Sequence, residues 1–312
     1  MNKIPVVAVV GPTASGKTGL AVEICKRFNG EAVSADSMQI YKGMDIATAK
    51  PTVEEMGGIK HHCMDFLDNT ESFSVADYQA LAYECIRQIN SERKLPVVVG
   101  GTGLYVDTLL NNIRLSEDSY NPELREKLFK RLKKEGAAVL IEEYEKIDPV
   151  YAQKLHENNA KRIVRAFEVW YSTGTTMTEQ LELSKRESPY DVCYIGLDAK
   201  NRDVLYERIN HRVDIMIEKG LVDEAREYLS NANGSTSAQA IGYKELKPFF
   251  DGAISLEKAV ENLKQSTRRY AKRQLTWFRR NECINWLYID NYQDAGMLFE
   301  QANKIVEERF QR

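Results

Sequence analysis

The chain has 312 residues, 43% of them apolar, and a formal net charge of −3 at pH 7. This length predicts about two domains, and the composition is that of a water-soluble protein that can bury a full core. The slightly acidic balance excludes an overall electrostatic attraction to nucleic acid but leaves room for a local basic face.

The five cysteines are scattered and odd in number. Because no pair has C-x-x-C spacing, a zinc site or a disulfide framework is not expected, and reduced cytoplasmic thiols are the simple interpretation. The apolar run at the N-terminus is a short strand rather than a signal peptide. No apolar stretch approaches the ~20 residues that span a bilayer. We therefore expect a cytoplasmic protein without a membrane segment.

A phosphate-binding loop follows the first predicted element, an apolar strand over residues 4–10. It matches the pattern G-x-x-x-x-G-K-[ST] at every required position and precedes a helix-compatible stretch over residues 19–27. In such a loop, backbone N–H groups and the helix N-terminus hold a polyphosphate, the lysine neutralises phosphate oxygens and the last hydroxyl binds Mg²⁺. The sequence thus predicts a diphosphate site with Mg²⁺ as cofactor, formed by Gly11, Pro12, Thr13, Ala14, Ser15, Gly16, Lys17 and the metal ligand Thr18.

Two further strands are predicted close to this loop, over residues 31–35 and 95–99, with a helix over residues 75–93 between them. Apolar strands that alternate with helices indicate a parallel sheet covered on both faces. Active sites in such sheets lie at the carboxyl ends of the strands. Because the phosphate loop, Asp36 and Thr102 all follow strand ends, we expect them to face one crevice.

From about residue 115 to residue 189 the pattern changes to charged helices. Asn121-Pro122 begins one of them, and Asn159 is expected to cap a second over residues 160–173, which ends at Gly174. A core-type strand returns at residues 194–198, followed by amphipathic stretches over 201–230 and 256–280. The predicted fold class is therefore α/β, a P-loop NTPase-like parallel sheet flanked by helices (residues 1–114 and 190–312) with an all-helical insertion domain (residues 115–189).

Asp36 admits three interpretations: a Mg²⁺ ligand, a general base, or an Asx-type turn that caps its own loop. The glycine-rich turn that contains Thr102 either lets the backbone approach a ligand closely or only joins a strand to a helix. Many NTPases carry an aspartate for Mg²⁺ at the corresponding strand end. The absence of such an aspartate here counts against ordinary ATP hydrolysis.

Arg208 and Arg212 lie one helical turn apart in a predicted helix. Guanidinium groups spaced in this way could hold a diphosphate by bidentate hydrogen bonds. Equally, they could form ion pairs with Glu207 and Asp214 on a solvated helix face. The sequence leaves both interpretations open.

The stretch over residues 264–280 is strongly basic and interleaved with aromatic residues. Cations mixed with aromatic side chains are typical of a nucleic-acid-binding surface, whereas a solvated helix with its aromatic residues in the core is the alternative. The cations are Lys264, Arg268, Arg269, Lys272, Arg273, Arg279 and Arg280, and the aromatic residues are Tyr270, Trp277 and Phe278.

Five motifs in chain order resemble those of the bacterial tRNA dimethylallyltransferases over nearly the whole chain. They are the phosphate loop, Asp36-Ser-Met-Gln-Ile-Tyr41, Val99-Gly-Gly-Thr-Gly-Leu-Tyr105, Ala240-Ile-Gly-Tyr-Lys244 and Lys272-Arg-Gln-Leu-Thr-Trp-Phe-Arg279. The resemblance implies transfer of a dimethylallyl group from dimethylallyl diphosphate to N6 of the adenosine on the 3′ side of a tRNA anticodon. Asp36 would accept the amine proton, and Thr102 would orient the diphosphate or the reacting nucleotide.

The same resemblance implies a set of contacts to the tRNA anticodon stem-loop. The target base has to leave the stack of the loop to reach the crevice. Gln39 or Tyr243 would read or stack on bases, and Arg125 would contact the RNA backbone. We expect a monomer whose tRNA-binding residues are Asp36, Ser37, Met38, Gln39, Thr102, Arg125, Lys161, Arg162, Arg165, Gln239, Gly242, Tyr243, Lys244, Lys272, Arg273, Gln274, Trp277 and Arg279.

Two other functions are compatible with parts of the sequence. A small-molecule or nucleoside kinase of the P-loop class explains the first two hundred residues but not the basic stretch near the C-terminus. A non-catalytic RNA-binding protein with a nucleotide switch explains the basic stretch but assigns no role to Asp36 and Thr102.

Overall fold

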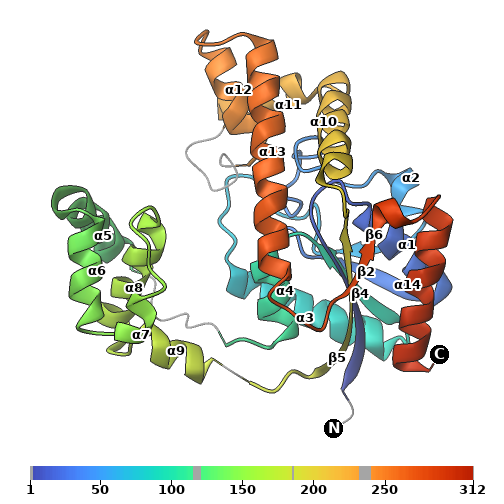
Figure 1. Cartoon of the computed structure of the whole chain (residues 1–312), viewed down its shortest axis with the longest axis horizontal. Helices are drawn as coiled ribbons and strands as arrows, with labels where there is room; N and C mark the ends of the chain where they lie inside the picture. Colours follow the sequence, from blue (N-terminus) through green and yellow to red (C-terminus); the bar gives the residue numbers. More distant parts are fainter. Residues whose placement is uncertain (1–2, 115–120, 185, 232–239, 312) are drawn as a thin grey trace. The chain divides into compact units, whose positions relative to one another are not determined.

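The computed structural model describes residues 3–114, 121–184, 186–231 and 240–311 (Figure 1). The chain forms two compact units: Met1–Leu110 with Ser188–Arg312, hereafter the sheet unit, and Asn111–Glu187, hereafter the helical unit. The helical unit starts at residue 111, four residues before the predicted start at 115. It ends at residue 187, two residues before the predicted end at 189.

The sheet unit is built on six parallel strands in the order β3-β2-β4-β1-β5-β6. Central strands buried on both faces explain the unbroken apolar runs in the sequence, and the predicted α/β fold is confirmed. The short edge strands β3 and β6 were not predicted. The strands are β1 (Ile4–Val10), β2 (Gly30–Ser34), β3 (His61–His62), β4 (Leu95–Gly100), β5 (Tyr190–Asp198) and β6 (Asn285–Tyr288).

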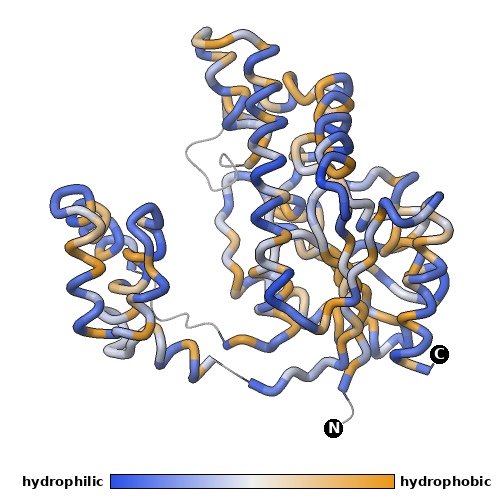
Figure 2. The backbone as a smooth tube through the Cα atoms, in the orientation of Figure 1, coloured by the Kyte–Doolittle hydropathy of each residue, from blue (hydrophilic) through white to orange (hydrophobic). Residues whose placement is uncertain are grey.

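Helices cover both faces of the sheet. Val6, Ala8 and Val10 of β1 pack toward α3 and α4, whereas Val7 and Val9 pack toward α1 and α14, because successive side chains of a strand point to opposite faces. Figure 2 shows apolar colouring along these strands and mixed apolar and polar colouring along the helices. The covering helices are α1 (Lys17–Arg27), α3 (Val75–Ser91), α4 (Gly103–Leu110) and α14 (Ala295–Phe310).

A second apolar core of the sheet unit lies among the helices that follow β5. There Val213, Leu221 and Leu263 pack with Tyr41 and Met44 from the loop after β2. The stretch predicted over residues 201–230 is broken by Gly220, whose φ of 98° ends one helix before the next begins. The helices are α10 (Arg202–Glu218), α11 (Leu221–Asn231), α12 (Tyr243–Phe250) and α13 (Leu256–Phe278), and the short elements α2 (Val53–Met56) and η3 (Ile289–Asn291) complete the unit.

The helical unit has a core of its own, which includes Tyr144 and Phe167. Asn121 caps its first helix as predicted, since its side chain accepts a hydrogen bond from the N–H of Leu124 at 3.0 Å. Asn159 precedes a helix but its side chain makes no capping bond, because its backbone (φ −112°, ψ 60°) is not extended. The helices are α5 (Pro122–Glu135), α6 (Ala137–Glu145), α7 (Pro149–Ala152), α8 (Ala160–Thr173) and α9 (Met177–Leu183).

In the part of the chain that the structure describes, no helix has both the length and the apolar character needed to cross a membrane.

Gly100 ends β4 at a point where a larger residue does not fit. A methyl group at this position would overlap the backbone carbonyl of Ala35. We expect Gly100→Ala to lower the free energy of unfolding by about 1–3 kcal/mol, measured by urea denaturation, because neither backbone can yield without disturbing the sheet. Gly19→Ala in α1 is the control: its methyl group meets only Phe299 at 3.7 Å. It should stabilise the protein by about 0.5–1 kcal/mol. Equal losses in both variants would contradict this account.

Candidate active site

A cavity of about 310 Å³ lies at the carboxyl ends of β1, β2 and β4, where the sequence predicted a crevice. Its walls come from the phosphate loop, the loop after β2, the turn after β4 and the helices α10 and α13. The residues with predicted roles that line it are Thr13, Ala14, Lys17, Thr18, Asp36, Ser37, Met38, Gln39, Arg212, Gly242, Lys244, Arg273 and Gln274.

The phosphate loop is wound by backbone conformations that favour glycine. Gly16 has a φ of 93° and Ala14 a φ of 63°, and α1 begins directly after Gly16. The N-terminal N–H groups of α1 therefore have no intrahelical acceptors and are free to bind an anion. Inside the loop, the ammonium group of Lys17 and the hydroxyl of Ser15 both donate to the carbonyl of Pro12, at 2.6 and 2.8 Å.

Three ionisable groups meet in the cavity and shift one another's pKa values. Burial and the neighbouring Arg212 lower the pKa of Lys17 to about 7, although Asp36 opposes the shift. Burial raises the pKa of Asp36, against the N–H of Met38 and the charge of Lys17. Burial also lowers the pKa of Arg212. Two cations held in a desolvated cavity favour the binding of an anion between them.

Both arginines of the α10 pair contact the phosphate loop, although Arg208 is also exposed to solvent. Arg208 donates from Nε to the carbonyl of Ala14 at 2.9 Å, and Arg212 lies 3.4 Å from the Thr13 hydroxyl. Asp214, the alternative partner, instead pairs with Lys264 at 2.6 Å. Because Arg212 lines the cavity and Arg208 does not, Arg212 is the better candidate for contact with a diphosphate.

Asp36 and Thr102 are joined through the backbone of the loop that follows β2. The Asp36 carboxylate accepts the N–H of Met38 at 2.9 Å, which is an Asx-type turn, and the Thr102 hydroxyl accepts the N–H of Ser37 at 3.1 Å. Thr102 supports the loop through this hydrogen bond and does not line the cavity. The turn does not exclude a chemical role for Asp36, because the carboxylate still lines the cavity.

Thr18 and Asp36 supply oxygen donors to the same cavity. Mg²⁺ takes oxygen ligands and usually keeps only one or two from the protein, with the rest from phosphates and water. Among the described residues, no group of three or more His, Cys, Asp or Glu side chains could hold a metal ion on its own. The donor set therefore fits a Mg²⁺ ion that arrives with a diphosphate.

Two residues predicted to contact RNA make structural contacts within the protein. The buried side chain of Gln274 bridges the two glycine-rich loops: its oxygen accepts the Thr13 N–H at 2.9 Å, and its nitrogen donates to the Gly101 carbonyl at 3.0 Å. Tyr243 is fully buried and stacks on Tyr228 with ring centroids 4.5 Å apart. Both residues were predicted from their place in a motif. Gln274 links the two loops at the cavity wall, whereas the burial of Tyr243 leaves its ring no surface on which a base could stack.

Sequence reasoning missed the loop over residues 44–51, of which Ala47, Thr48, Ala49 and Pro51 line the cavity. The Gln39 amide donates to the carbonyls of Thr48 and Ala49, at 3.2 and 3.3 Å. Its oxygen accepts the hydroxyl of Ser34 at 3.1 Å, so the protein itself engages both ends of the side chain that was expected to read a base. The small polar and apolar residues of this loop carry no pattern that marks a site.

The C-terminal part of α13 has basic side chains on its exposed side. Lys272 and Arg273 are exposed, and the Arg273 guanidinium lies 5.6 Å from the centre of the Tyr270 ring. Trp277 is half-buried and donates its indole N–H to Asp107 at 2.7 Å. Arg279 pairs with the buried Asp198 at 2.7 Å. Lys272 and Arg273 are therefore the residues of this group best placed to meet an external polyanion.

The remaining predicted RNA contacts lie in the helical unit, apart from Gln239, which is outside the described residues. Arg125 and Arg165 both pair with the buried carboxylate of Glu168, at 2.9 and 3.1 Å. Arg162 donates to the Tyr151 hydroxyl at 3.2 Å, and Lys161 is exposed. Because a buried carboxylate needs a cation beside it, Arg125 and Arg165 stabilise the helical unit by neutralising Glu168. This structural role is independent of any contact with RNA.

A phosphate loop between the first strand and first helix of a parallel α/β sheet, beside a cavity lined by Lys17, Arg212 and Asp36, defines the class of P-loop proteins. Within this class, the model of the IPP transferase family matches residues 39–281. The chain belongs to that family.

Similar proteins match almost the whole chain. A tRNA dimethylallyltransferase of Caldanaerobacter subterraneus subsp. tengcongensis is 49% identical over 302 residues, which is 95% of this chain and 96% of that protein. One from Bacillus subtilis is also 49% identical, over 91% of each chain. Among solved structures, a tRNA isopentenylpyrophosphate transferase from Bacillus halodurans is 43% identical over 99% of both chains, with a TM-score of 0.74.

A eukaryotic dimethylallyltransferase, described as acting on tRNA, has the same fold. Its TM-score is 0.82 at 28% identity, and the match covers 98% of this chain and 80% of that one.

Proposed function

We propose that the protein is a tRNA dimethylallyltransferase, which moves the dimethylallyl group of dimethylallyl diphosphate onto N6 of the adenosine on the 3′ side of the anticodon. The observation that carries this proposal is the cavity in which Lys17 and Arg212 lie beside the carboxyl group of Asp36. An anion site and a base side by side suit a reaction that releases diphosphate and removes a proton. The names of the relatives, which cover almost the whole chain, support the same substrates.

In the proposed reaction the N6 amine forms a bond to C1 of the dimethylallyl group while the bond from C1 to the diphosphate oxygen breaks. The electron pair of the breaking bond leaves with the diphosphate, and the proton of the amine passes to Asp36. Burial raises the pKa of Asp36, which makes its carboxylate a better proton acceptor than an ordinary aspartate.

Lys17, Arg212 and the N-terminal N–H groups of α1 would bind the departing diphosphate. These groups lie in a desolvated cavity, where they stabilise developing negative charge more strongly than in water, and a bound diphosphate favours the charged form of Lys17. A Mg²⁺ ion held by Thr18 would add Lewis-acid stabilisation of the same oxygens when bound.

The RNA partner in this proposal is the anticodon stem-loop of a tRNA in the cytoplasm. Lys244 lines the cavity, and the exposed Lys272 and Arg273 project from α13, which supports a path for an RNA strand across this surface. The target base has to leave its stack to present N6 to Asp36.

A P-loop kinase is the alternative function, and a feature of the turn after β4 weighs against it. Kinases and NTPases of this class hold Mg²⁺ with a strand-terminal aspartate, whereas β4 is followed by Gly101, Thr102 and Gly103. Incubation with labelled ATP and a panel of nucleosides tests the kinase directly, and phosphate transfer without RNA would favour it.

The deciding experiment is mass spectrometry of an unmodified anticodon stem-loop incubated with the protein, dimethylallyl diphosphate and Mg²⁺. We expect a product whose mass corresponds to one added C5H8 group, located on the adenosine 3′ of the anticodon. A stem-loop with guanosine at that position is the control and should stay unmodified. An unchanged adenosine substrate would overturn the proposal.

The basic end of α13 is expected to contribute to tRNA affinity through phosphate contacts. In Lys272→Ala/Arg273→Ala, the slope of log affinity against log salt should flatten by about 1 for each lost contact. Filter binding of the stem-loop at several KCl concentrations measures this slope. Lys304→Ala, an exposed lysine on α14 at the opposite face of the sheet, serves as the control. Equal slopes in the wild type and the double variant would remove the electrostatic role of α13.

A further inference from the structure

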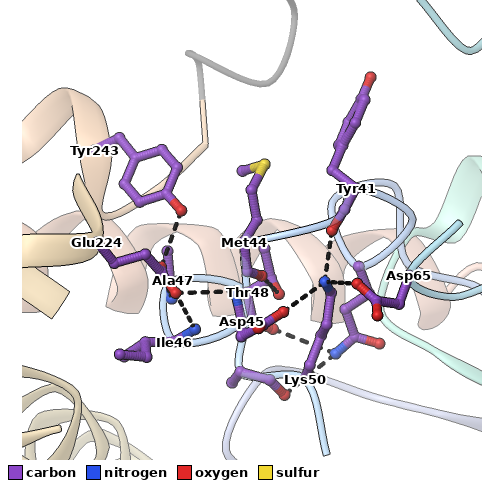
Figure 3. A network of polar contacts seen from close by, with 12 residues as sticks. Tyr41, Met44, Asp45, Ile46, Ala47, Thr48, Lys50, Asp65, Glu224 and Tyr243 are labelled. Atoms are coloured by element: carbon purple, nitrogen blue, oxygen red, sulfur yellow. Dashed lines mark hydrogen bonds and ion pairs between the residues drawn. The ribbon is translucent and has the colours of Figure 1, made fainter. Parts of the chain in front are cut away.

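A carboxylate on α11 organises the loop that forms one wall of the cavity (Figure 3). Glu224 accepts three consecutive backbone N–H groups, from Asp45, Ile46 and Ala47, at 2.9, 2.7 and 2.9 Å. The hydroxyl of Tyr243 donates a further hydrogen bond to the same carboxylate at 2.9 Å. Its two oxygens thus use all four of their lone-pair positions within the protein.

The loop held in this way is tied to the reactive part of the cavity. Its carbonyl at Ala49 accepts hydrogen bonds from Gln39 at 3.3 Å and from Arg212 at 3.4 Å. Gln39 follows Asp36 in the same short loop, and Arg212 lies beside Lys17. A shift of the loop would therefore move the supports of the anion-binding arginine.

The far end of the loop has a separate anchor. Lys50 donates to the carbonyl of Tyr41 at 2.5 Å and pairs with Asp45 and Asp65, both at 2.6 Å (Figure 3). Glu224 holds the first part of the loop, and Lys50 holds the last. Between them lie Ala47, Thr48 and Ala49, which line the cavity.

We propose that Glu224 is a positioning residue for the transfer reaction: it fixes the backbone of residues 45–47 and, through it, the position of the Ala49 carbonyl that orients Arg212 toward the diphosphate. This inference rests on the proposed function for its substrate, but the loop geometry stands without it. Nothing in the sequence pattern marks Glu224, which lies in an ordinary amphipathic helix far along the chain.

The neighbouring segment at the start of α12 contacts this carboxylate through the Tyr243 hydroxyl but has a second anchor of its own. The backbone N–H of Gly242, where α12 begins, is held by Glu245 at 3.0 Å. Loss of the Glu224 charge should therefore disturb the diphosphate side of the cavity and leave the start of α12 in place. Because the two sides of the cavity have different anchors, we expect weaker binding of dimethylallyl diphosphate and little change in the binding of tRNA.

Glu224→Gln is the variant that tests the inference, because it keeps the shape of the side chain. One carboxylate oxygen becomes an NH2 group, a donor that faces backbone donors and cannot accept their hydrogens. Glu227→Gln is the matched control: it makes the same substitution on the exposed side of the same helix.

In Glu224→Gln we expect the amides of residues 45–47 to exchange with deuterium at least about tenfold faster than in the wild type. The KM for dimethylallyl diphosphate should rise about tenfold, while the KM for tRNA stays within about threefold of the wild-type value. Tyr243→Phe removes one of the four donors and should give a smaller change in the same direction. Glu227→Gln should leave the exchange of residues 45–47 and both KM values at their wild-type levels.

Unchanged amide exchange in residues 45–47 would overturn the proposal. It would also fall if activity declined only in proportion to the unfolded fraction, with both KM values unchanged, since this is the signature of a purely structural role. If the wild type itself transfers no dimethylallyl group, the proposed function fails, and the exchange contrast between Glu224→Gln and Glu227→Gln still decides whether Glu224 fixes the loop.

Discussion

Asp36→Asn is expected to lower the rate of dimethylallyl transfer by about 10²–10⁴-fold and to leave the affinity for tRNA close to that of the wild type. Asparagine keeps an oxygen that can accept the Met38 N–H, so the turn observed at 2.9 Å is preserved. Only the basicity of the side chain is lost. Single-turnover kinetics at saturating stem-loop measure the rate, and fluorescence anisotropy measures the affinity. Asp36→Ala, which removes the turn as well, should be at least as slow.

The pH dependence of the same variant gives an independent check on Asp36. A general base works only when it is deprotonated, so kcat/KM falls as the pH drops through its pKa. Because burial raises the pKa of Asp36, the wild type should lose activity at a higher pH than an exposed aspartate would require. This acidic limb should be absent from the residual activity of Asp36→Asn.

Two results would contradict the assignment of Asp36 as the base. One is weakened tRNA binding with normal turnover at saturating RNA, because it would make Asp36 an RNA contact. The other is an acidic limb that persists unchanged in Asp36→Asn. Asp203→Asn, an exposed aspartate in the first turn of α10, controls for a general effect of removing a carboxylate and should keep full activity.

The sheet could be predicted from the sequence where strands are long, apolar and buried on both faces. β1 has the predicted bounds, because its seven residues are an apolar run directly before a recognisable loop. β3 has only two residues and is made of histidines, and β6 is a four-residue edge strand with one buried side chain. Their pairing depends on tertiary neighbours, which a local pattern cannot contain.

In the candidate site, too, local features could be predicted from the sequence, whereas contacts between distant segments could not. The phosphate loop and the strand-end position of Asp36 are local features, so the sequence predicted their meeting in one cavity. Tyr243 and Gln274 belong to motifs that mark the neighbourhood, but the motif does not say which side chain faces outward. Glu224 was missed because its partners are backbone N–H groups about 180 residues earlier in the chain, a separation of 177 to 179 positions. Such contacts exist only after the fold brings α11 to the loop.

Lys17→Met should lower kcat/KM for dimethylallyl diphosphate by about 10²–10³-fold, the cost of removing one donor aimed at developing charge in a desolvated site. The methionine side chain is similar in length to that of lysine but carries no charge. The fall in kcat/KM therefore measures the contribution of the Lys17 charge. tRNA affinity, measured by anisotropy, should change little, because Lys17 donates within the phosphate loop and is not part of the exposed basic side of α13. A Lys17→Met enzyme with normal kcat/KM would remove the loop from the reaction.

The protonation of Lys17 provides the sharper test of what the loop binds. Burial and Arg212 lower its pKa to about 7 in the free protein, so at pH 8 most of the molecules carry a neutral Lys17. A bound diphosphate favours the charged form and raises this pKa, and proton uptake on binding follows. Titration calorimetry with inorganic diphosphate and Mg²⁺ in two buffers of different ionisation enthalpy measures that uptake. Arginine stays charged at this pH, so Lys17→Arg should bind with less proton uptake than the wild type, whereas equal uptake would show that Lys17 is already charged in the free protein.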